Sequence, residues 1–273
     1  FRQDSRLLCF DEPFNPLLRE LPAEQAKGPR REFIEIFERD PAHFWEVFAP
    51  IERTGELQRG LPEPPQRYLD FLLSHSRDIV LDTTRCHFKI ESLRRSDPDA
   101  TLVHLYRPAV AFASSHVARR VTGLFGRTRS AYQKHAVFTR SDRYGGWGLP
   151  ELIGDSPQSL FGLRLREAGL DPEAMYRLPA VGKVLAYWWL HFQEIEKRGA
   201  ETFGERFLSV RFDDFCAEPE KIFSRIYHIG GLEPPRIDPR SIHRPNKGYR
   251  PHDPRWIELA QQVGIPAEQG LLF

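Results

Sequence analysis

The sequence of 273 residues has few of the residues that build metal centres, cross-linked scaffolds or membrane spans. It contains one methionine and three cysteines, and Cys9, Cys86 and Cys216 lie far apart with no Cys-x-x-Cys pair. This number and spacing predict neither a zinc site nor a disulfide framework. No apolar run approaches the roughly 18 residues of a membrane-spanning helix, so we expect no membrane span. With no signal peptide visible, we expect the chain to be cytoplasmic.

An excess of charge of one sign is also missing. The 39 Lys and Arg residues nearly balance 38 Asp and Glu residues, and the net charge of +1 gives no general attraction to nucleic acid or membranes. Any anion site must therefore be local. Hydrophobic residues make up 40% of the chain, enough for a proper core, so we expect residues 1–273 to form a single domain.

The stretch from Asp99 to Arg120 carries the first candidate anion site. Residues 101–106 have the length and the β-branched or aromatic content of a buried parallel strand. Pro108 suits the first turn of a helix, and residues 109–118 favour one. Arg107 would then lie at the helix N-terminus, with Ser114 and Ser115 two turns further on, where an anion could bind. An ordinary strand–helix junction with a surface arginine is an equally good interpretation.

Two further junctions carry polar side chains. Residues 5–10 indicate a strand that ends before Glu12, at the end where open α/β sheets bind ligands. Residues 78–81 indicate a second short strand, followed by Arg85 and His87 and then by a helix over 89–96. The alternatives are an exposed loop carboxylate for Glu12 and a structural histidine for His87.

The second half of the sequence contains one long helix, predicted over residues 178–198, with Trp188 and Trp189 on its buried stripe. A strand over 207–211 and a helix over 219–229 follow it, so strands and helices alternate as in α/β proteins. Residues 119–148 are basic and weakly periodic, which is typical of a lid or insertion, although a solvated loop fits equally well.

Three segments together resemble the PAPS-dependent sulfotransferases. The first, His104-Leu-Tyr-Arg-Pro-Ala-Val-Ala-Phe-Ala-Ser-Ser, is similar to the strand–helix segment that binds the 3′-phosphate of the donor. The second, Val210-Arg-Phe-Asp-Asp-Phe, is similar to a late strand with its acidic pair. The third, Arg244-Pro-Asn-Lys-Gly, is similar to the basic loop that covers the nucleotide. The resemblance implies a P-loop-NTPase-like open sheet, with central parallel strands flanked by helices on both faces.

The resemblance also implies roles for single residues. Arg107 and either Ser114 or Ser115 would hold the 3′-phosphate; the register stays open because the family usually has Arg-Asp-Pro-Arg where this chain has Arg107-Pro108-Ala109. Glu12 falls where many members place the catalytic carboxylate, with His87 as the second candidate. Arg85 or His87 would replace a family lysine that this chain lacks.

The remaining candidate nucleotide contacts come from the basic loop of the C-terminal tail. Arg244, Lys247 and Gly248 would lie against the donor there, since a glycine flanked by cations can wrap a phosphate. The family's loop for the 5′-phosphosulfate group should precede a helix that ends near Phe1, and it is absent from this sequence. We expect that loop in a segment upstream of Phe1.

The function implied is transfer of a sulfuryl group from PAPS to a hydroxyl or amine acceptor, with PAP as product and without a metal. The acceptor would be a small molecule or a glycan, which the sequence does not specify. Two alternatives stay open: a P-loop kinase that uses ATP, with Asp213 and Asp214 near its magnesium, and a catalytically silent module that binds sulfated or phosphorylated partners.

Overall fold

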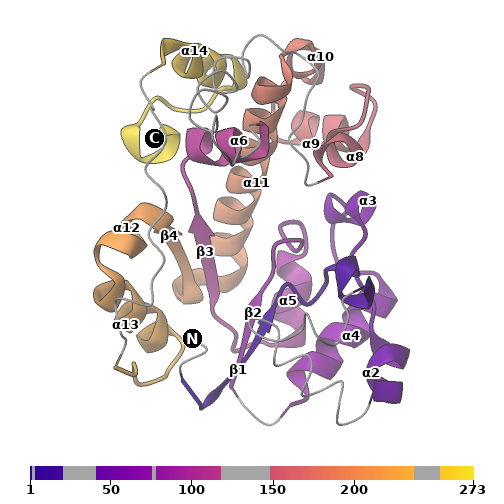
Figure 1. Cartoon of the computed structure of the whole chain (residues 1–273), viewed down its shortest axis with the longest axis vertical. Coiled ribbons are helices and arrows are strands. Elements are labelled where there is room, and N and C mark those ends of the chain that lie inside the picture. The colour runs from indigo at the N-terminus through magenta and orange to yellow at the C-terminus, as the bar shows by residue number, and fades with distance from the viewer. Residues whose placement is uncertain (2–3, 21–40, 76–77, 118–147, 237–252) are drawn as a thin grey trace, which may run out of the picture.

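The computed structural model describes residues 1, 4–20, 41–75, 78–117, 148–236 and 253–273, and shows a mixed α/β protein (Figure 1). None of its helices is both long and apolar enough to cross a membrane. The elements in chain order are β1 (Leu7–Asp11), the 3-10 helix η1 (Pro16–Glu20), α2 (Pro41–Val47), α3 (Arg53–Glu56), α4 (Glu63–Leu73), β2 (Asp78–Asp82), α5 (Ile90–Ser96), β3 (Leu102–Tyr106), α6 (Ala109–Val117), α8 (Leu149–Ile153), α9 (Leu160–Glu167), α10 (Pro172–Arg177), α11 (Ala180–Phe203), the 3-10 helix η2 (Gly204–Arg206), β4 (Phe207–Arg211), α12 (Phe212–Ala217), α13 (Pro219–Ile229), α14 (Pro254–Val263) and α15 (Gln269–Leu272).

The four strands in the described ranges form two parallel pairs. β1 pairs with β2, with Leu7 opposite Asp78, and β3 pairs with β4, with Leu102 opposite Phe207. The parallel strands confirm the predicted α/β class. Among the described residues, however, β2 and β3 are not hydrogen-bonded, so the two pairs do not join into the single open sheet that the sequence predicted.

The β1–β2 pair is covered on both faces, as parallel strands generally are. Because side chains alternate along a strand, Leu8 and Phe10 pack on one face against the helices between β1 and β2, in a cluster with aromatic residues of α2 and α4. Leu7 and Cys9 point to the other face, where they pack with Phe223 of α13. The apolar run of β1 is therefore buried on both sides.

The β3–β4 pair rests on the long helix α11. Leu102 and Phe207 pack with Ile195 and Phe203 of α11 and with α5. Gly199 lets this helix approach β4, since a Cβ there would lie 2.5 Å from the Phe207 ring. The same face carries polar contacts: Glu196 of α11 accepts a hydrogen bond from Ser209 and lies 2.6 Å from His104 Nδ1.

The largest core cluster lies around the N-terminal half of α11, between α6, α8 to α10 and α14. Trp188 and Trp189 are buried in it, in agreement with the prediction that they belong to the core. Trp188 also donates a hydrogen bond from its indole nitrogen to the carbonyl oxygen of Arg107, 3.0 Å away. This bond fixes the end of β3 to α11.

Residues 53–66, although rich in glycine and proline, contain α3 and the start of α4, which begins at Glu63 because Pro64 and Pro65 suit a first helical turn. In the segment that begins at Pro41, Trp45 has 40% of its surface exposed, while the neighbouring Phe44 and Phe48 are buried.

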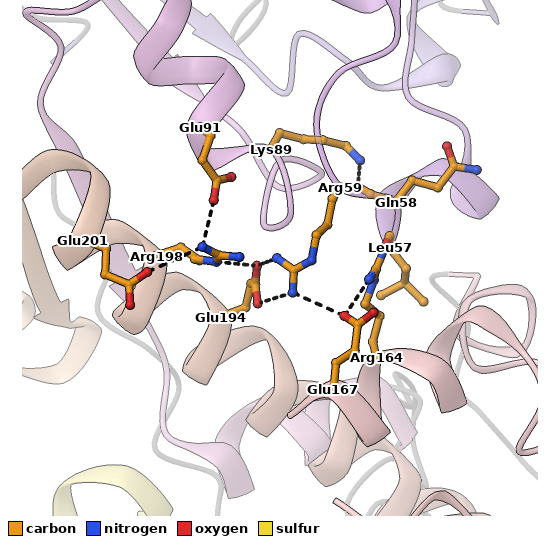
Figure 2. A network of polar contacts seen from close by, with 10 residues as sticks. All are labelled: Leu57, Gln58, Arg59, Lys89, Glu91, Arg164, Glu167, Glu194, Arg198 and Glu201. Atoms are coloured by element: carbon orange, nitrogen blue, oxygen red, sulfur yellow. Dashed lines mark hydrogen bonds and ion pairs between the residues drawn. The ribbon is translucent and has the colours of Figure 1, made fainter. Parts of the chain in front are cut away.

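A network of charged side chains connects the segment between α3 and α4 to α9 and α11 (Figure 2). Arg59 forms ion pairs with Glu194 of α11 and Glu167 of α9, and Arg164 also pairs with Glu167 at 2.6 Å. Arg198 extends the network to Glu91 of α5 at 3.5 Å. The network therefore connects α9 and α11 to α5, which follows β2, and to the segment between α3 and α4.

Candidate functional site

Glu12 lies directly after β1, at the carboxyl end of the strand. Its backbone nitrogen donates to the carbonyl oxygen of Asp82 at the end of β2, so the two strand ends stay together. Among the described residues, Glu12 is the only non-glycine residue with a positive φ, at 49°. A non-glycine residue in this sparsely populated backbone conformation is held there by its surroundings, and such residues concentrate at functional sites.

The carboxylate of Glu12 is oriented by Asn15. The Nδ2 atom of Asn15 donates to Oε2 of Glu12 at 2.5 Å, while its Oδ1 accepts from the backbone nitrogen of Leu17. Asn15 is itself 5% exposed, so its amide has little freedom to turn away. The contact restrains the carboxylate of a half-buried residue.

A shallow open hollow, too small to enclose a water molecule, adjoins this carboxylate. It lies between the chain after β1 and the chain after β2. Its lining consists of Glu12, Phe14, Asn15, Thr83, Thr84 and Arg85. The hollow therefore brings together two residues that the sequence analysis singled out, Glu12 and Arg85.

Arg85 is buried, with 5% of its surface exposed, and its charge is balanced by a carboxylate. Its Nη1 atom donates to Oε1 of Glu56, which is 2% exposed and also pairs with Arg53 at 3.0 Å. Burial raises the pKa of Glu56, and the two guanidinium groups oppose that shift. The Nε atom of Arg85 is buried and has no hydrogen-bond partner among the described residues.

His87 is not among the residues that line the hollow, and its side chain is half-buried against α11. Its ring stands edge-on to His191 of α11, with ring centres 4.7 Å apart, and its Nδ1 has no partner among the described residues. Burial, reinforced by the neighbouring His191 and His104, lowers the pKa of His87 well below its usual value. The structure thus separates His87 from Glu12, the other candidate base.

Arg107 directly follows β3 and is separated from α6 by Pro108, in the strand–helix corner that the sequence predicted. The side chain is exposed, and its guanidinium carbon lies 4.9 Å from the centre of the Phe212 ring. A planar cation held against an aromatic face keeps its N–H groups available at its edges. Arg107 is therefore placed to bind an anion at this corner.

The two serines of α6 face different surroundings. Ser114 is buried, and its hydroxyl donates to the carbonyl oxygen of Val110 at 2.6 Å. Ser115 is exposed and donates to the carbonyl oxygen of Phe112 at 2.7 Å, with His116 Nδ1 at 3.0 Å. Of the two hydroxyl groups left open by the sequence, only that of Ser115 faces solvent.

The other predicted features lie outside the described residues. These are the basic loop with Arg244, Lys247 and Gly248, and residues 119–147 of the predicted lid. Asp213, considered for a kinase, pairs with Arg211 at 3.1 Å. In the described ranges no group of three or more His, Cys, Asp or Glu side chains is arranged to hold a metal ion.

Three residues of this region were not singled out by sequence: Asn15, Glu56 and Lys89. Asn15 follows Glu12 by three residues, a spacing that suits a local turn and could have indicated the contact. Glu56 lies 29 residues before Arg85, so nothing local indicated that pair. Lys89 is fully buried and donates to the carbonyl oxygens of Gly55 and Gln58; burial lowers its pKa to about 8.

Comparisons of the chain with models of known protein families, with curated proteins and with solved structures find no significant match.

Proposed function

We propose that this chain belongs to a sulfotransferase that transfers a sulfuryl group from PAPS to a hydroxyl or amine acceptor. The observation that carries the proposal is the placement of two strand–helix corners. Glu12 follows β1 and Arg107 follows β3, and Figure 1 shows both strands running toward the same end of the molecule. Open α/β sheets bind their ligands at the carboxyl ends of the strands.

The Arg107 corner fits the 3′-phosphate of the donor. A guanidinium group forms strong, charge-assisted hydrogen bonds with a phosphate, and the free backbone N–H groups of the first turn of α6 add to them. Ser115 is the better hydroxyl partner, since Ser114 is buried with its hydroxyl bound within the helix. These groups would distinguish PAPS from nucleotides that lack a 3′-phosphate.

In this proposal the reacting group of the acceptor approaches the exposed side of the Glu12 corner. In sulfuryl transfer the acceptor oxygen or nitrogen forms a bond to sulfur while the bond from sulfur to the phosphate oxygen breaks and PAP leaves. The acceptor proton goes to a base within hydrogen-bond reach. Glu12, oriented by Asn15, is that base, and the buried charge of Arg85 lies beside it in the same hollow.

Titration calorimetry with PAP tests the donor site. We expect Arg107→Ala to weaken PAP binding by about 1.5–3 kcal/mol, the contribution of a charge-assisted hydrogen bond. Ser115→Ala should weaken binding as well, whereas Ser114→Ala should not. Arg206→Ala is the control, because Arg206 is a partly exposed arginine that precedes β4 at the opposite end of the strands. Equal PAP affinity of the Arg107 and Arg206 variants would refute the assignment.

The catalytic step is tested with Glu12→Gln. This variant should slow sulfuryl transfer from PAPS without weakening PAP binding, since the amide keeps the shape but cannot accept the proton. Turnover equal to wild type would remove Glu12 from the mechanism. Thermal shift assays separate the alternatives: stabilisation by ATP with magnesium, and none by PAP, would favour a kinase.

A further inference from the structure

The hydroxyl group of Ser115 is already engaged, although the residue is exposed. It donates to the carbonyl oxygen of Phe112, one turn back along α6, at 2.7 Å. A serine has one O–H donor, so this hydroxyl must turn away from the carbonyl oxygen before it can donate to a phosphate. The loss of that hydrogen bond opposes phosphate binding unless another donor replaces it.

A second donor lies beside the same carbonyl oxygen. The Nδ1 atom of His116 is 2.9 Å from the oxygen of Phe112 and 3.0 Å from Oγ of Ser115. Because a carbonyl oxygen only accepts hydrogen bonds, Nδ1 carries the ring proton in this contact. The His116 ring is stacked on the Phe112 ring, with ring centres 4.0 Å apart, and this contact keeps Nδ1 in place. The Phe112 carbonyl therefore keeps a side-chain donor when Ser115 turns away.

The charges around His116 determine how the ring responds to pH. Burial lowers the pKa of His116, the contact with the Phe112 carbonyl opposes that shift, and the positive charge of Arg107 adds to it. From α11, Tyr187 stacks on Phe112, and burial raises its pKa, so it carries no charge. The helix α15, which also packs on α6, has no charged residue. Arg107 is thus the charged group that acts on His116 within the described part of the chain, and a phosphate bound to Arg107 would offset its effect.

We propose that His116 is a positioning residue of the donor site: its Nδ1–H group keeps the Phe112 carbonyl paired while the Ser115 hydroxyl turns to the 3′-phosphate. At lower pH the ring also takes up a proton, and its positive charge then attracts the same phosphate. The inference rests on the proposed function, since it takes Ser115 as a ligand of PAP. It adds a pH dependence that Arg107, which is always charged, cannot give.

Titration calorimetry with PAP at pH 8 and pH 6 tests this role. His116→Phe keeps a ring against Phe112 but has no N–H group, so PAP binding at pH 8 should weaken about three- to ten-fold, as expected for one hydrogen bond. His116→Asn has an amide N–H close to the position of Nδ1 and should restore most of the affinity. Neither variant titrates at residue 116, so the wild-type affinity relative to both should rise at least about three-fold from pH 8 to pH 6. Protonation of PAP itself cancels in this ratio.

A serine variant and a matched histidine separate positioning from packing. At pH 8, His116→Phe should have no further effect in a Ser115→Ala protein, because there is no hydroxyl group left to release. His75→Phe is the matched control. At the end of α4, Oγ of Ser74 and Nδ1 of His75 contact the carbonyl oxygen of Phe71 in the same way, at 2.7 Å and 3.1 Å. That pair precedes β2, at the opposite end of the strands from the donor site, so this variant should leave PAP affinity unchanged.

The outcomes distinguish this inference from the proposed function. If the His116→Phe and His75→Phe variants bind PAP equally well, or if the effects of Ser115→Ala and His116→Phe simply add, His116 has no positioning role while the donor site stands. Inorganic phosphate, followed by the NMR signals of the histidine rings, is the second probe. If phosphate binding shows the expected pattern of variants but PAP binds no more tightly than phosphate, the sulfotransferase assignment fails and the role of His116 stands. Binding of neither ligand to the wild-type protein refutes both.

Discussion

The buried ion pair of Glu56 and Arg85 allows a quantitative test of how the region behind Glu12 is held together. Glu56→Gln keeps the shape of the side chain but removes the charge that compensates Arg85. Both residues are at most 5% exposed, so the guanidinium would remain buried without an anion. Removing one partner of a buried ion pair costs about 3–5 kcal/mol, a large share of a typical stability of about 5–15 kcal/mol.

Two companion variants separate this effect from a general loss of packing. Arg53→Gln removes the second partner of Glu56. Because the Arg53 side chain is 32% exposed, this variant should lower the free energy of unfolding by at most about 1 kcal/mol. Glu56→Gln combined with Arg85→Met removes both buried charges and should recover most of the loss, since apolar replacements of buried pairs are often neutral. The coupling energy of this double-mutant cycle measures the pair.

Urea denaturation at pH 7, followed by the fluorescence of the buried tryptophans of α11, measures five proteins: wild type, Glu56→Gln, Arg53→Gln, the double variant, and Arg85→Met alone, which completes the cycle. If Glu56→Gln lowers the free energy of unfolding by no more than Arg53→Gln does, Glu56 does not stabilise the fold by compensating the buried charge of Arg85. The same conclusion follows if the double variant is as unstable as Glu56→Gln, because the loss would then come from packing around residue 56 rather than from an uncompensated charge.

Three further predictions concern the interior. Burial lowers the pKa of His191 from 6.5 to about 4, so between these pH values the unfolded chain binds more protons than the folded chain, and the free energy of unfolding falls as the pH falls. The full loss is about 3 kcal/mol. His191→Phe should reduce it, as measured by urea titrations at pH 4.5 and 7.5. For Lys89, whose pKa is lowered to about 8, the unfolded chain holds the extra proton above that pH, so the stability of wild type relative to Lys89→Met should rise between pH 7.5 and 9.5. Gly162→Ala should lower the melting temperature by several degrees, because its Cβ would lie 2.0 Å from the carbonyl oxygen of Pro157, whereas Gly230→Ala, with no atom closer than 3.4 Å, should not.

The local elements could be predicted from the sequence because their signals are local. The strands before Glu12 and Arg107 are short apolar runs that end at charged or proline residues, and α13 ends at Ile229 as predicted. The long helix over residues 178–198 was predicted from its apolar stripe, and it continues to Phe203. These patterns depend only on neighbouring residues.

The contacts that shape the candidate site could not be predicted in the same way. The bond from Trp188 to the carbonyl oxygen of Arg107 joins residues 81 positions apart, and the pair of Arg85 with Glu56 joins residues 29 apart. A single sequence gives no information on such distant pairing. The burial of His87 against His191 is also a tertiary effect, since both are ordinary polar residues in the sequence.

The position of α11 has a consequence for how the two corners are spaced. Its 24 residues form a rod of about 36 Å. Trp188, in the N-terminal half of the helix, holds the Arg107 corner, while Glu194 and Ile195, in its C-terminal half, contact Arg59 and α5 on the side of β2. Since no hydrogen bonds join β2 to β3, α11 sets the distance between the Glu12 corner and the Arg107 corner. Inserting or deleting one residue between Trp188 and Glu194 would rotate the contacts of Trp188 by about 100° relative to those of Glu194 and Ile195. It would misalign the two corners without changing a residue in either of them.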